Sequence, residues 1–552
     1  LFRSTFLNDA VLRAFEKLTS KEVVRPDLAG LMGAYGCALI AKKRWNKKSM
    51  TTLLTPDKLH SFTVKTTHTR CGRCENNCPL TVNRFADRRV FITGNRCERG
   101  AGKQKVENNL PNLVREKYDK LFKREGLKGE EAHRGKIGIL RVLNMYENYP
   151  FWHRFLTELG FEVVLSDPSS KKIFEQGIET IPSESVCYPA KLAHGHLINL
   201  VEKGVKKVFY PAVVYEKEET IAQNNHYNCP VVASYPEVIR VNMRPVLEEN
   251  GIEYISPFLN LDSEKSLLKG LCESFPDIPK REIEEALQKA KEEEKAFKEW
   301  LARRGEEVIR QLEKEGIKGI IFAGHPYHID PAINHGISEE INRLGMGVLT
   351  EDSVAHLVDE QHVGVVNQWT FHSRLYRAAD VVKKYKHLEL LQVTSFGCGL
   401  DAITTDAVEE ILEEANQLYT WIKMDEISNL GAARIRLRSL KAAMEERSRE
   451  GFDARQFNKR LKEPEVVFDK KDKEIRTILA PQMLPTHFEL FEHAFKLHGY
   501  KVKVIKEVRD EDIDVGLKYV NNDACYPAII TIGQLVAELQ NGGYDLDRTA
   551  VI

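Results

Sequence analysis

A cysteine motif occurs twice in this chain of 552 residues and constrains its fold more than any other feature. Ser-Val-Cys-Tyr-Pro-Ala surrounds Cys187, and Asp-Ala-Cys-Tyr-Pro-Ala surrounds Cys525. Each copy follows an apolar run, a helix-period segment, a glycine and a second apolar run, in that order. Gly160 and Gly499 lie 339 positions apart and the two cysteines 338, so the copies stay in register. The repeat predicts two α/β lobes with one cysteine at the same place in each.

The length and the pattern of apolar segments predict several domains of one class. We expect an α/β protein with repeated flavodoxin-like or Rossmann-like parallel-sheet lobes, long connecting helices and a small cysteine-rich module. The start without Met and the end inside an apolar run predict that both ends belong to a longer polypeptide. The expected divisions are a helical segment (1–48), the cysteine-rich module (49–130), a first lobe (131–276), a connecting helix (277–316), a middle lobe (317–422), a polar connector (423–470) and a truncated second copy of the first lobe (471–552).

Composition argues against several classes of function. The chain has 81 basic and 81 acidic side chains, and this balance gives no support for binding nucleic acid or a membrane surface. No apolar run approaches the roughly 18 residues that a membrane-spanning helix needs. We therefore expect a cytoplasmic protein. Ten cysteines in a chain of this length, several of them clustered, indicate metal binding more than a disulfide framework.

The densest cysteine cluster lies in the predicted module. Cys71, Cys74 and Cys78 fall within eight residues, a proline follows the last of them, and Cys97 completes a set of four. Four thiolates suit either a 4Fe–4S cluster or a structural zinc ion. The unequal spacing and the proline are typical of ferredoxin loops, so iron–sulfur is favoured. Zinc and unligated cysteines are the alternatives.

Three further cysteines have the surroundings of cofactor ligands. Cys187 and Cys229 each stand just before a proline or a Tyr-Pro pair, which places them on loops before helices. Cys398 stands between Gly397 and Gly399 after a predicted strand, where the backbone can approach a bulky group. A helix N-terminus stabilises a thiolate, as a ligand requires. The alternative is that they are buried structural cysteines, which is how Cys37 and Cys272 are interpreted.

Two groups of histidines were weighed as metal ligands. His194 and His196 are two residues apart and cannot share a helix face, so we expect polar contacts from them. Three histidines lie close together after a predicted strand in the middle lobe. No carboxylate or cysteine stands at a fitting spacing in the sequence, so a hydrogen-bonding loop is predicted. The three are His325, His328 and His335.

Taken together, these motifs resemble the C-terminal part of large acyl-CoA dehydratase activase-related proteins. In that superfamily an activator ATPase is fused to a module related to 2-hydroxyacyl-CoA dehydratases and double-cubane iron–sulfur proteins. The segment 4–41 resembles the last two helices of the activator ATPase, which has an actin-like fold. Arg3 and Ser4 stand where the family has a Gly-Gly pair, so we expect ATP binding only through the largely absent activator domain.

The resemblance implies ATP-coupled delivery of low-potential electrons to a small or acyl-CoA substrate. It implies a cluster between α/β lobes, either 4Fe–4S or a double-cubane 8Fe–9S cluster, and an auxiliary cluster in the module. The implied partners are an activator ATPase, fused or separate, and a second copy of the chain. A 2-hydroxyacyl-CoA dehydratase component and a non-catalytic zinc scaffold that docks an activase are the alternatives. The implied cluster ligands are Cys187, Cys229, Cys398 and Cys525, and the auxiliary ligands are Cys71, Cys74, Cys78 and Cys97.

Overall fold

The structure is a computed structural model, and the chain in it forms two compact units. One unit comprises Leu1–His68 and Thr81–Phe91, and the other comprises Thr69–Leu80 and Ile92–Ile552. Across the whole chain, the structure describes residues 9–25, 29–45, 54–60, 62–72, 79–94, 109–220, 223–359, 363–426, 430–451, 468–469, 471–521 and 523–552.

The N-terminal region contains helices and one small sheet. The helices α1 (Asp9–Thr19) and α2 (Met32–Arg44) bury none of their described side chains, and α3 (Pro56–His60) follows. Three strands then form a sheet in chain order, β1 (Val64–Arg70), β2 (Pro79–Phe85) and β3 (Val90–Thr93). This sheet flanks the predicted cysteine cluster, because β1 ends just before Cys71 and β2 begins just after Cys78.

The first lobe is a parallel sheet in the order β5-β4-β6-β8. The apolar strand β4 (Lys136–Ile139) lies inside this sheet, as its buried residues require. The strands β7 and β9 form a second parallel pair, and they follow β6 and β8 respectively in the sequence. The other elements are β5 (Glu162–Leu165), β6 (Lys207–Phe209), β7 (Ala212–Tyr215), β8 (Glu253–Ile255), β9 (Phe258–Asn260), α4 (Leu113–Phe122), α5 (Met145–Glu158), α6 (Lys171–Gly177), α7 (Tyr188–Glu202), α8 (Pro230–Asn242), α9 (Arg244–Glu249) and α10 (Glu264–Ser274).

The middle lobe is a second parallel sheet, in the order β11-β10-β12-β13. Every residue of β12 (Leu388–Ser395) is buried, as expected for a central parallel strand covered on both faces. The other elements are β10 (Gly319–Ala323), β11 (Gly347–Thr350), β13 (Tyr419–Met424), the 3-10 helix η5 (Pro326–Ile329), α12 (Ile337–Arg343), α13 (Glu351–Val354), α14 (Thr370–Lys384), α15 (Gly399–Glu413) and α16 (Leu430–Arg449).

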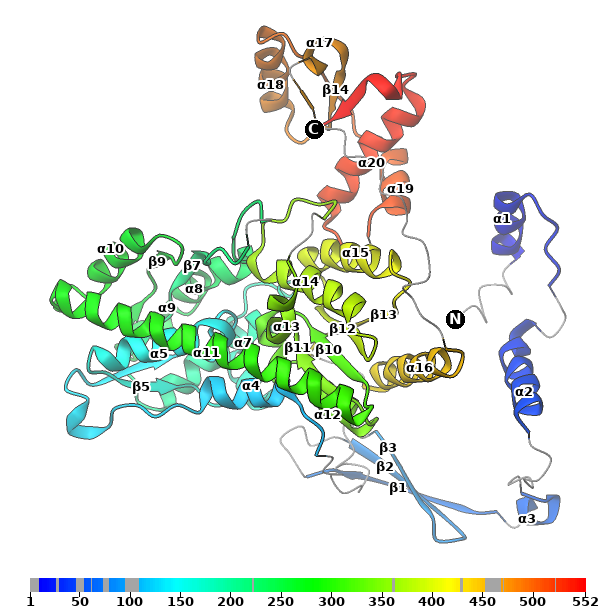
Figure 1. The fold of residues 1–552 in the computed structure, drawn as a ribbon, viewed down its shortest axis with the longest axis horizontal. Helices are drawn as coiled ribbons and strands as arrows, with labels where there is room; N and C mark the ends of the chain where they lie inside the picture. The colour runs from blue at the N-terminus through cyan, green and yellow to red at the C-terminus, as the bar shows by residue number, and fades with distance from the viewer. Residues whose placement is uncertain are drawn as a thin grey trace. The chain divides into compact units, whose positions relative to one another are not determined.

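The connecting helix α11 (Lys280–Glu315) joins the two lobes and packs against both. It contacts α5 of the first lobe and α13 of the middle lobe (Figure 1). Its apolar stripe, which includes Ile283 and Leu312, is buried, and Gly316 ends it in the left-handed conformation. One apolar core contains side chains of the first lobe, of α11 and of the middle lobe. The two lobes therefore form one packed body.

The C-terminal lobe repeats the first one. Its parallel sheet has the order β15-β14-β16, which matches β5-β4-β6, and its connections pass through helices in the same sequence. Gly160 and Gly499 occupy equivalent turns with φ of +85° and +81°. These matches in strand order and turn conformation agree with the predicted duplication. The elements are α17 (Asp472–Ile475), β14 (Thr477–Ala480), α18 (Pro485–Leu497), β15 (Lys501–Val504), α19 (Asp510–Tyr519), α20 (Tyr526–Asn541) and β16 (Thr549–Val551).

Both copies pack two helices through glycines at matching positions. A Cβ on Gly195 of α7 would lie 1.6 Å from the carbonyl oxygen of Ile173 in α6. In the C-terminal copy, a Cβ on Gly533 of α20 would lie 1.8 Å from the carbonyl oxygen of Asp512 in α19. Contacts this short exclude any side chain, so the helix that follows the repeated cysteine has its backbone against the preceding helix in each lobe.

The parallel sheets and many helices confirm the predicted α/β class. In the part of the chain that the structure describes, no helix combines the length and apolar character that crossing a membrane requires.

Candidate functional site

Each of the four lobe cysteines predicted to bind a cofactor immediately precedes a helix. Cys187 precedes α7, Cys229 precedes α8, Cys398 precedes α15 and Cys525 precedes α20. In α7, α8 and α20 a proline occupies the first turn, where its missing N–H has no partner to lose. The prediction that Cys187 and Cys229 lie on loops before helices is confirmed. Their role as ligands stays a prediction.

Three of these thiols share one neighbourhood. A thiolate at Cys187, Cys229 or Cys398 would interact electrostatically with the other two and with Tyr327. Cys229 lines the same cavity as His325, whose Nε2 lies 3.8 Å from Cys398 Sγ. All three are partly accessible to solvent. Among the described residues no interaction joins Cys525, which is exposed, to this group. We call Cys187, Cys229 and Cys398 the thiol group.

Burial keeps the thiol group protonated when no metal is bound. It raises the pKa of Cys187 to about 12, although the backbone N–H of Ala190 lowers this pKa. Burial also raises the pKa of Cys229 and Cys398, and the nearby Asp401 carboxylate adds to both increases. The sequence-based argument that a helix N-terminus stabilises the thiolate is thus outweighed by burial. A bound cation would reverse the balance, because metal ligation deprotonates a thiol.

A histidine and a carboxylate lie beside the thiol group. His325 follows β10, and its Nε2 lies 2.9 Å from Asp401 Oδ1 and 3.8 Å from Cys398 Sγ. Asp401 Oδ2 accepts a hydrogen bond from the backbone N–H of Ser395 at 2.9 Å. The histidine loop has no carboxylate or cysteine at a fitting spacing in the sequence, and folding brings both to it from a distant segment. Asp401 lies in the first turn of α15, and Cys398 immediately precedes that helix. Both follow His325 by more than seventy positions in the chain.

The other predicted histidines have structural partners. His328 accepts a hydrogen bond at Nδ1 from the backbone N–H of His325 and contacts Ser395 Oγ at 3.2 Å. His335 Nε2 contacts the Asp425 carbonyl oxygen at 2.8 Å. These contacts fit the predicted hydrogen-bonding loop. Both rings of the first-lobe pair are fully buried and bonded at both nitrogens, to Thr180 and Tyr235 for His194 and to Ser166 and Ser169 for His196.

A small cavity opens against the thiol group. Asn144, Cys229, Tyr327 and His372 are among the residues that line it. Asn144 is only 2% exposed, yet neither of its amide atoms has a hydrogen-bond partner, and His372 Nε2, in a side chain 4% exposed, also has none. Burial lowers the pKa of His372 to about 3, so its ring is neutral. Buried polar atoms without partners are costly, so Asn144 and His372 mark this small cavity, which has room for about one water-sized group, as a candidate binding site.

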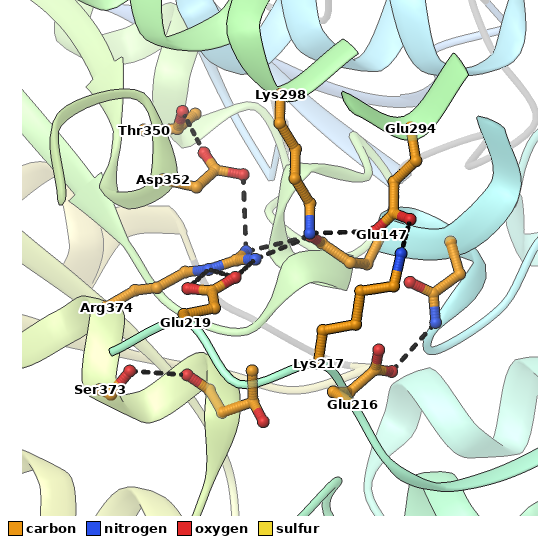
Figure 2. A network of polar contacts seen from close by, with 12 residues as sticks. Glu147, Glu216, Lys217, Glu219, Glu294, Lys298, Thr350, Asp352, Ser373 and Arg374 are labelled. Carbon is orange, nitrogen blue, oxygen red and sulfur yellow. Dashed lines mark hydrogen bonds and ion pairs between the residues drawn. The ribbon is translucent and has the colours of Figure 1, made fainter. Parts of the chain in front are cut away.

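A buried network of charged side chains lies between the first and middle lobes (Figure 2). Arg374 on α14 contacts Glu147 at 2.7 and 3.0 Å and Glu219 at 3.0 Å. Lys298 of α11 lies 3.8 Å from Glu147 and 3.0 Å from Glu294. Despite burial, the neighbouring Arg374 holds the pKa of Glu219 well below its usual range. The sequence predicts α11 as a connecting helix only, but its Glu294 and Lys298 belong to this network. Asp352, Lys217, Lys117 and Arg377 also belong to it.

The network and the cavity are carried by the same three segments. The start of α5 supplies Asn144 to the cavity and Glu147 to the network. The segment from β7 to α8 supplies Cys229 and Glu219, and α14 supplies His372 and Arg374. In each segment the two roles are only two to ten residues apart. The ion pairs therefore fix the positions of these three segments, which line the cavity, relative to one another.

Glu216 links the network to the loop of Cys229 and gives a pH-dependent prediction. Its Oε1 accepts hydrogen bonds from Asn148 and Asn228, each at 2.9 Å, and Asn228 Oδ1 accepts one from the Cys229 N–H. Burial raises the pKa of Glu216 from 4.5 to about 7, and Asn148 partly offsets this increase. As pH rises, Glu216 ionises near pH 4.5 in the unfolded chain and only near pH 7 in the folded one. The contribution of this group to stability is therefore complete below pH 4.5 and lost by about pH 7.

We expect Glu216→Gln to stabilise the protein at about pH 8, by up to about 3 kcal/mol relative to its effect at about pH 4.5. Glutamine keeps the oxygen that accepts both hydrogen bonds and removes the cost of ionisation. Denaturant midpoints measured at both pH values test this, with the exposed Glu249→Gln as a control that should shift little at either. Equal shifts at the two pH values would show that Glu216 is not responsible.

The predicted cysteine-rich module lies largely outside the described residues. Cys74, Cys78 and Cys97 fall outside them, and Cys71 is half-buried just beyond the end of β1. The described flanks approach each other, because a Cβ on Gly94, which follows β3, would lie 2.3 Å from the carbonyl oxygen of Pro79. The shared metal site of Cys71, Cys74, Cys78 and Cys97 stays a prediction.

The two remaining described cysteines differ from each other. Cys272 packs against the apolar core, as interpreted from the sequence. Cys37 lies on α2 and is exposed, so its interpretation as a packing residue is wrong in the part of the chain that the structure describes.

Comparison with known families identifies one part of the chain. Residues 136–354 match the family described as CoA enzyme activase uncharacterised domain. This activase-related domain covers well under half of the chain. The curated proteins include no match. Among solved structures, transketolase from Campylobacter jejuni subsp. jejuni NCTC 11168 is similar at 13% identity over 71% of this chain and 68% of that chain. Its TM-score is 0.13, too low to carry an argument.

The activase-related domain contains only part of the site. It includes Cys187, Cys229 and His325, whereas Cys398 and His372 lie beyond its end. Sequence reasoning missed the cavity residues Asn144 and His372 and gave Asp401 no role. Asp401 follows Cys398 in the sequence Phe-Gly-Cys-Gly-Leu-Asp, so its place two residues after the Cys-Gly pair was an available signal. Nothing in the sequence around Asn144 or His372 distinguishes them from ordinary helix residues.

Proposed function

We propose that this activase-related chain holds an iron–sulfur cluster at the thiol group and uses it to pass low-potential electrons to a small or acyl-CoA substrate. The observation that carries the proposal is the meeting of three thiols from three helix starts in one buried neighbourhood. We propose further that an activator ATPase, fused or separate, supplies the electrons in an ATP-dependent step. The match to a CoA enzyme activase domain supports this partner.

The donors present suit such a cluster. Cysteine sulfur is the usual ligand of iron–sulfur clusters, and helix N-termini direct backbone N–H groups toward the sulfurs and the cluster charge. When bound, the cluster would supply one-electron chemistry at low potential. Ligation would also offset the cost of forming thiolates in a buried place, because the metal takes the place of their protons. We propose Cys525 as a fourth ligand, and Cys71, Cys74, Cys78 and Cys97 as the ligands of an auxiliary cluster.

The residues around the cavity would position the substrate. Asn144 offers an amide donor and acceptor, and the neutral His372 offers Nε2, so an oxygen of a carbonyl or hydroxyl group would find a partner there. The lining contains no Asp, Glu, Lys or Arg. The phosphates of a CoA ester would consequently bind outside the cavity, and only the reacting end of the substrate would enter. The ion-pair network would keep this surface rigid during the reaction.

Dehydration of a 2-hydroxyacyl-CoA is the second candidate. It is favoured by the presence of three thiols instead of four in the described neighbourhood, next to unpaired polar groups that can orient a substrate oxygen. The two functions differ in their products. Reduction consumes electrons in proportion to product, whereas dehydration forms an enoyl-CoA without net reduction.

The test is metal analysis of anaerobically purified protein and of two cysteine variants. We expect iron with acid-labile sulfide and broad visible absorbance. Cys398→Ser should lose about half of the iron, since the auxiliary cluster would remain. Cys272→Ser removes a thiol that packs against the core and should keep the full content. Zinc without sulfide would support the scaffold alternative, and equal iron loss in both variants would contradict the assignment of Cys398.

A further inference from the structure

Two histidines and an aspartate from three separate segments meet beside the thiol group. His325 follows β10, His372 lies on α14 and Asp401 lies on α15. One potential ligand atom from each lies within 4.8 Å of the other two. All three side chains are buried, at 5%, 4% and 3% exposure. The three residues are far apart in the sequence, and they meet only when the chain folds.

The distances fit a single metal ion. Two ligands held about 2.1 Å from a tetrahedral ion are about 3.4 Å apart. The separation of 2.9 Å between His325 Nε2 and Asp401 Oδ1 and the outer limit of 4.8 Å lie on either side of this value. Closing a separation of 4.8 Å to about 3.4 Å requires each of the two side chains to move by about 0.7 Å, which brings the three atoms onto one ion.

The neighbours of the three residues favour a ligand site over a plain hydrogen bond. His372 Nε2 has no partner in a side chain more than nine-tenths buried, so one nitrogen of the set lacks the contact that burial demands. Asp401 Oδ2 is fixed by the Ser395 N–H, which leaves Oδ1 to face His325. The Tyr327 ring stacks on His325, with centroids 4.9 Å apart and planes 8° from parallel. Such surrounding contacts orient ligands in metal sites.

We propose that His325, His372 and Asp401 bind one divalent first-row transition-metal ion. Two imidazoles and one carboxylate are donors that zinc, iron and cobalt accept, with one or more positions left open. The open side would face the cavity, where the amide of Asn144 has no partner and can hydrogen-bond a metal-bound water. Metal ligation requires ligand atoms free of protons, so affinity falls as pH falls. Cys398 Sγ, 3.8 Å from His325 Nε2, stands beside the ion.

This site goes beyond the proposed electron transfer, since its donors are nitrogen and oxygen and it needs no cluster. A Lewis acid at this place would polarise a substrate oxygen that enters the cavity. It would also place a positive charge next to the thiol group, which offsets the cost of forming thiolates in a buried region.

The experiment uses the full chain with Cys71→Ser and Cys74→Ser, because the predicted four-cysteine site would itself bind cobalt. This protein, purified without iron or sulfide, is titrated with Co²⁺, and visible absorbance and tight-binding stoichiometry are followed. We expect a single equivalent with the d–d bands of four- or five-coordinate cobalt, and at least a hundredfold weaker binding in His372→Ala. The matched control is His387→Ala, which removes another buried ring nitrogen without a partner, outside the set. Circular dichroism of both variants establishes that they are folded.

Two results would overturn the site. One is strong thiolate-to-cobalt charge transfer that persists in His372→Ala, which would place the ion on the cysteines. The other is equal affinity in the wild type, His372→Ala and His387→Ala, which would leave only adventitious binding. Neither result bears on the cluster, whose test is the iron and sulfide content of anaerobically purified protein.

Discussion

Replacing Arg374 with methionine is expected to lower the free energy of unfolding of the two packed lobes by about 3–5 kcal/mol. Methionine preserves much of the volume but leaves Glu147 and Glu219 without the guanidinium that they share at 2.7 to 3.0 Å. Both carboxylates are largely buried, and Lys298 at 3.8 Å from Glu147 and Arg377 at 2.8 Å from Glu219 compensate only in part. A buried charge that loses its partner costs far more than the intact pair contributes.

Denaturant unfolding followed by tryptophan fluorescence measures this effect. Trp152, Trp300, Trp369 and Trp421 lie in the two lobes and α11, so the signal reports on the region that contains the network. The control is Arg281→Met, whose exposed pair with Glu285 should be worth less than about 0.5 kcal/mol. Adding Glu219→Gln to Arg374→Met should recover part of the loss. A loss no larger than that of Arg281→Met would mean that the network adds nothing to stability.

Replacing Gly195 with alanine is expected to destabilise the first lobe by about 3 kcal/mol or more. The added methyl would lie 1.6 Å from the carbonyl oxygen of Ile173, a backbone atom that cannot move away as a side chain can. The helices α6 and α7 must separate, and Cys187 at the start of α7 should move with them. We therefore expect loss of metal at the thiol group together with loss of stability.

The matched control is Gly36→Ala in α2, where a Cβ would meet nothing within 4 Å. Alanine is the better helix former by about 1 kcal/mol, so this variant should be neutral or slightly stabilised. Thermal unfolding and iron content measure both consequences. The equivalent Gly533→Ala should destabilise the C-terminal lobe and spare the iron bound by Cys187. A Gly195→Ala protein as stable as wild type would contradict the close helix contact.

Much of the fold was predictable from repeated local patterns. Gly160 and Gly499 mark the same helix end in two copies, and the structure gives both a positive φ and gives their sheets the same strand order. The loop positions of Cys187 and Cys229 followed from the prolines after them, since proline limits where a helix can begin. These features depend on a few neighbouring residues, and a single sequence contains that information.

The candidate site was predictable only in part. Cys187, Cys229 and Cys398 were singled out by their local surroundings, but His372, Asp401 and Asn144 were not. Their importance comes from contacts between segments that are tens to hundreds of residues apart. The charge network is similar, because Glu294 and Lys298 lie on a highly charged helix, and only the packing of α11 against α5 brings Lys298 near Glu147.

The sequence by itself determined the α/β lobes, their duplication and the placement of cysteines before helices, because backbone preferences and apolar periodicity act over short distances. The tertiary structure alone decided which side chains meet around Tyr327, and that burial, not the helix dipole, sets the protonation of the thiols. Burial and charge pairing are properties of the surrounding atoms. Those atoms come from distant parts of the chain and are brought together only by folding.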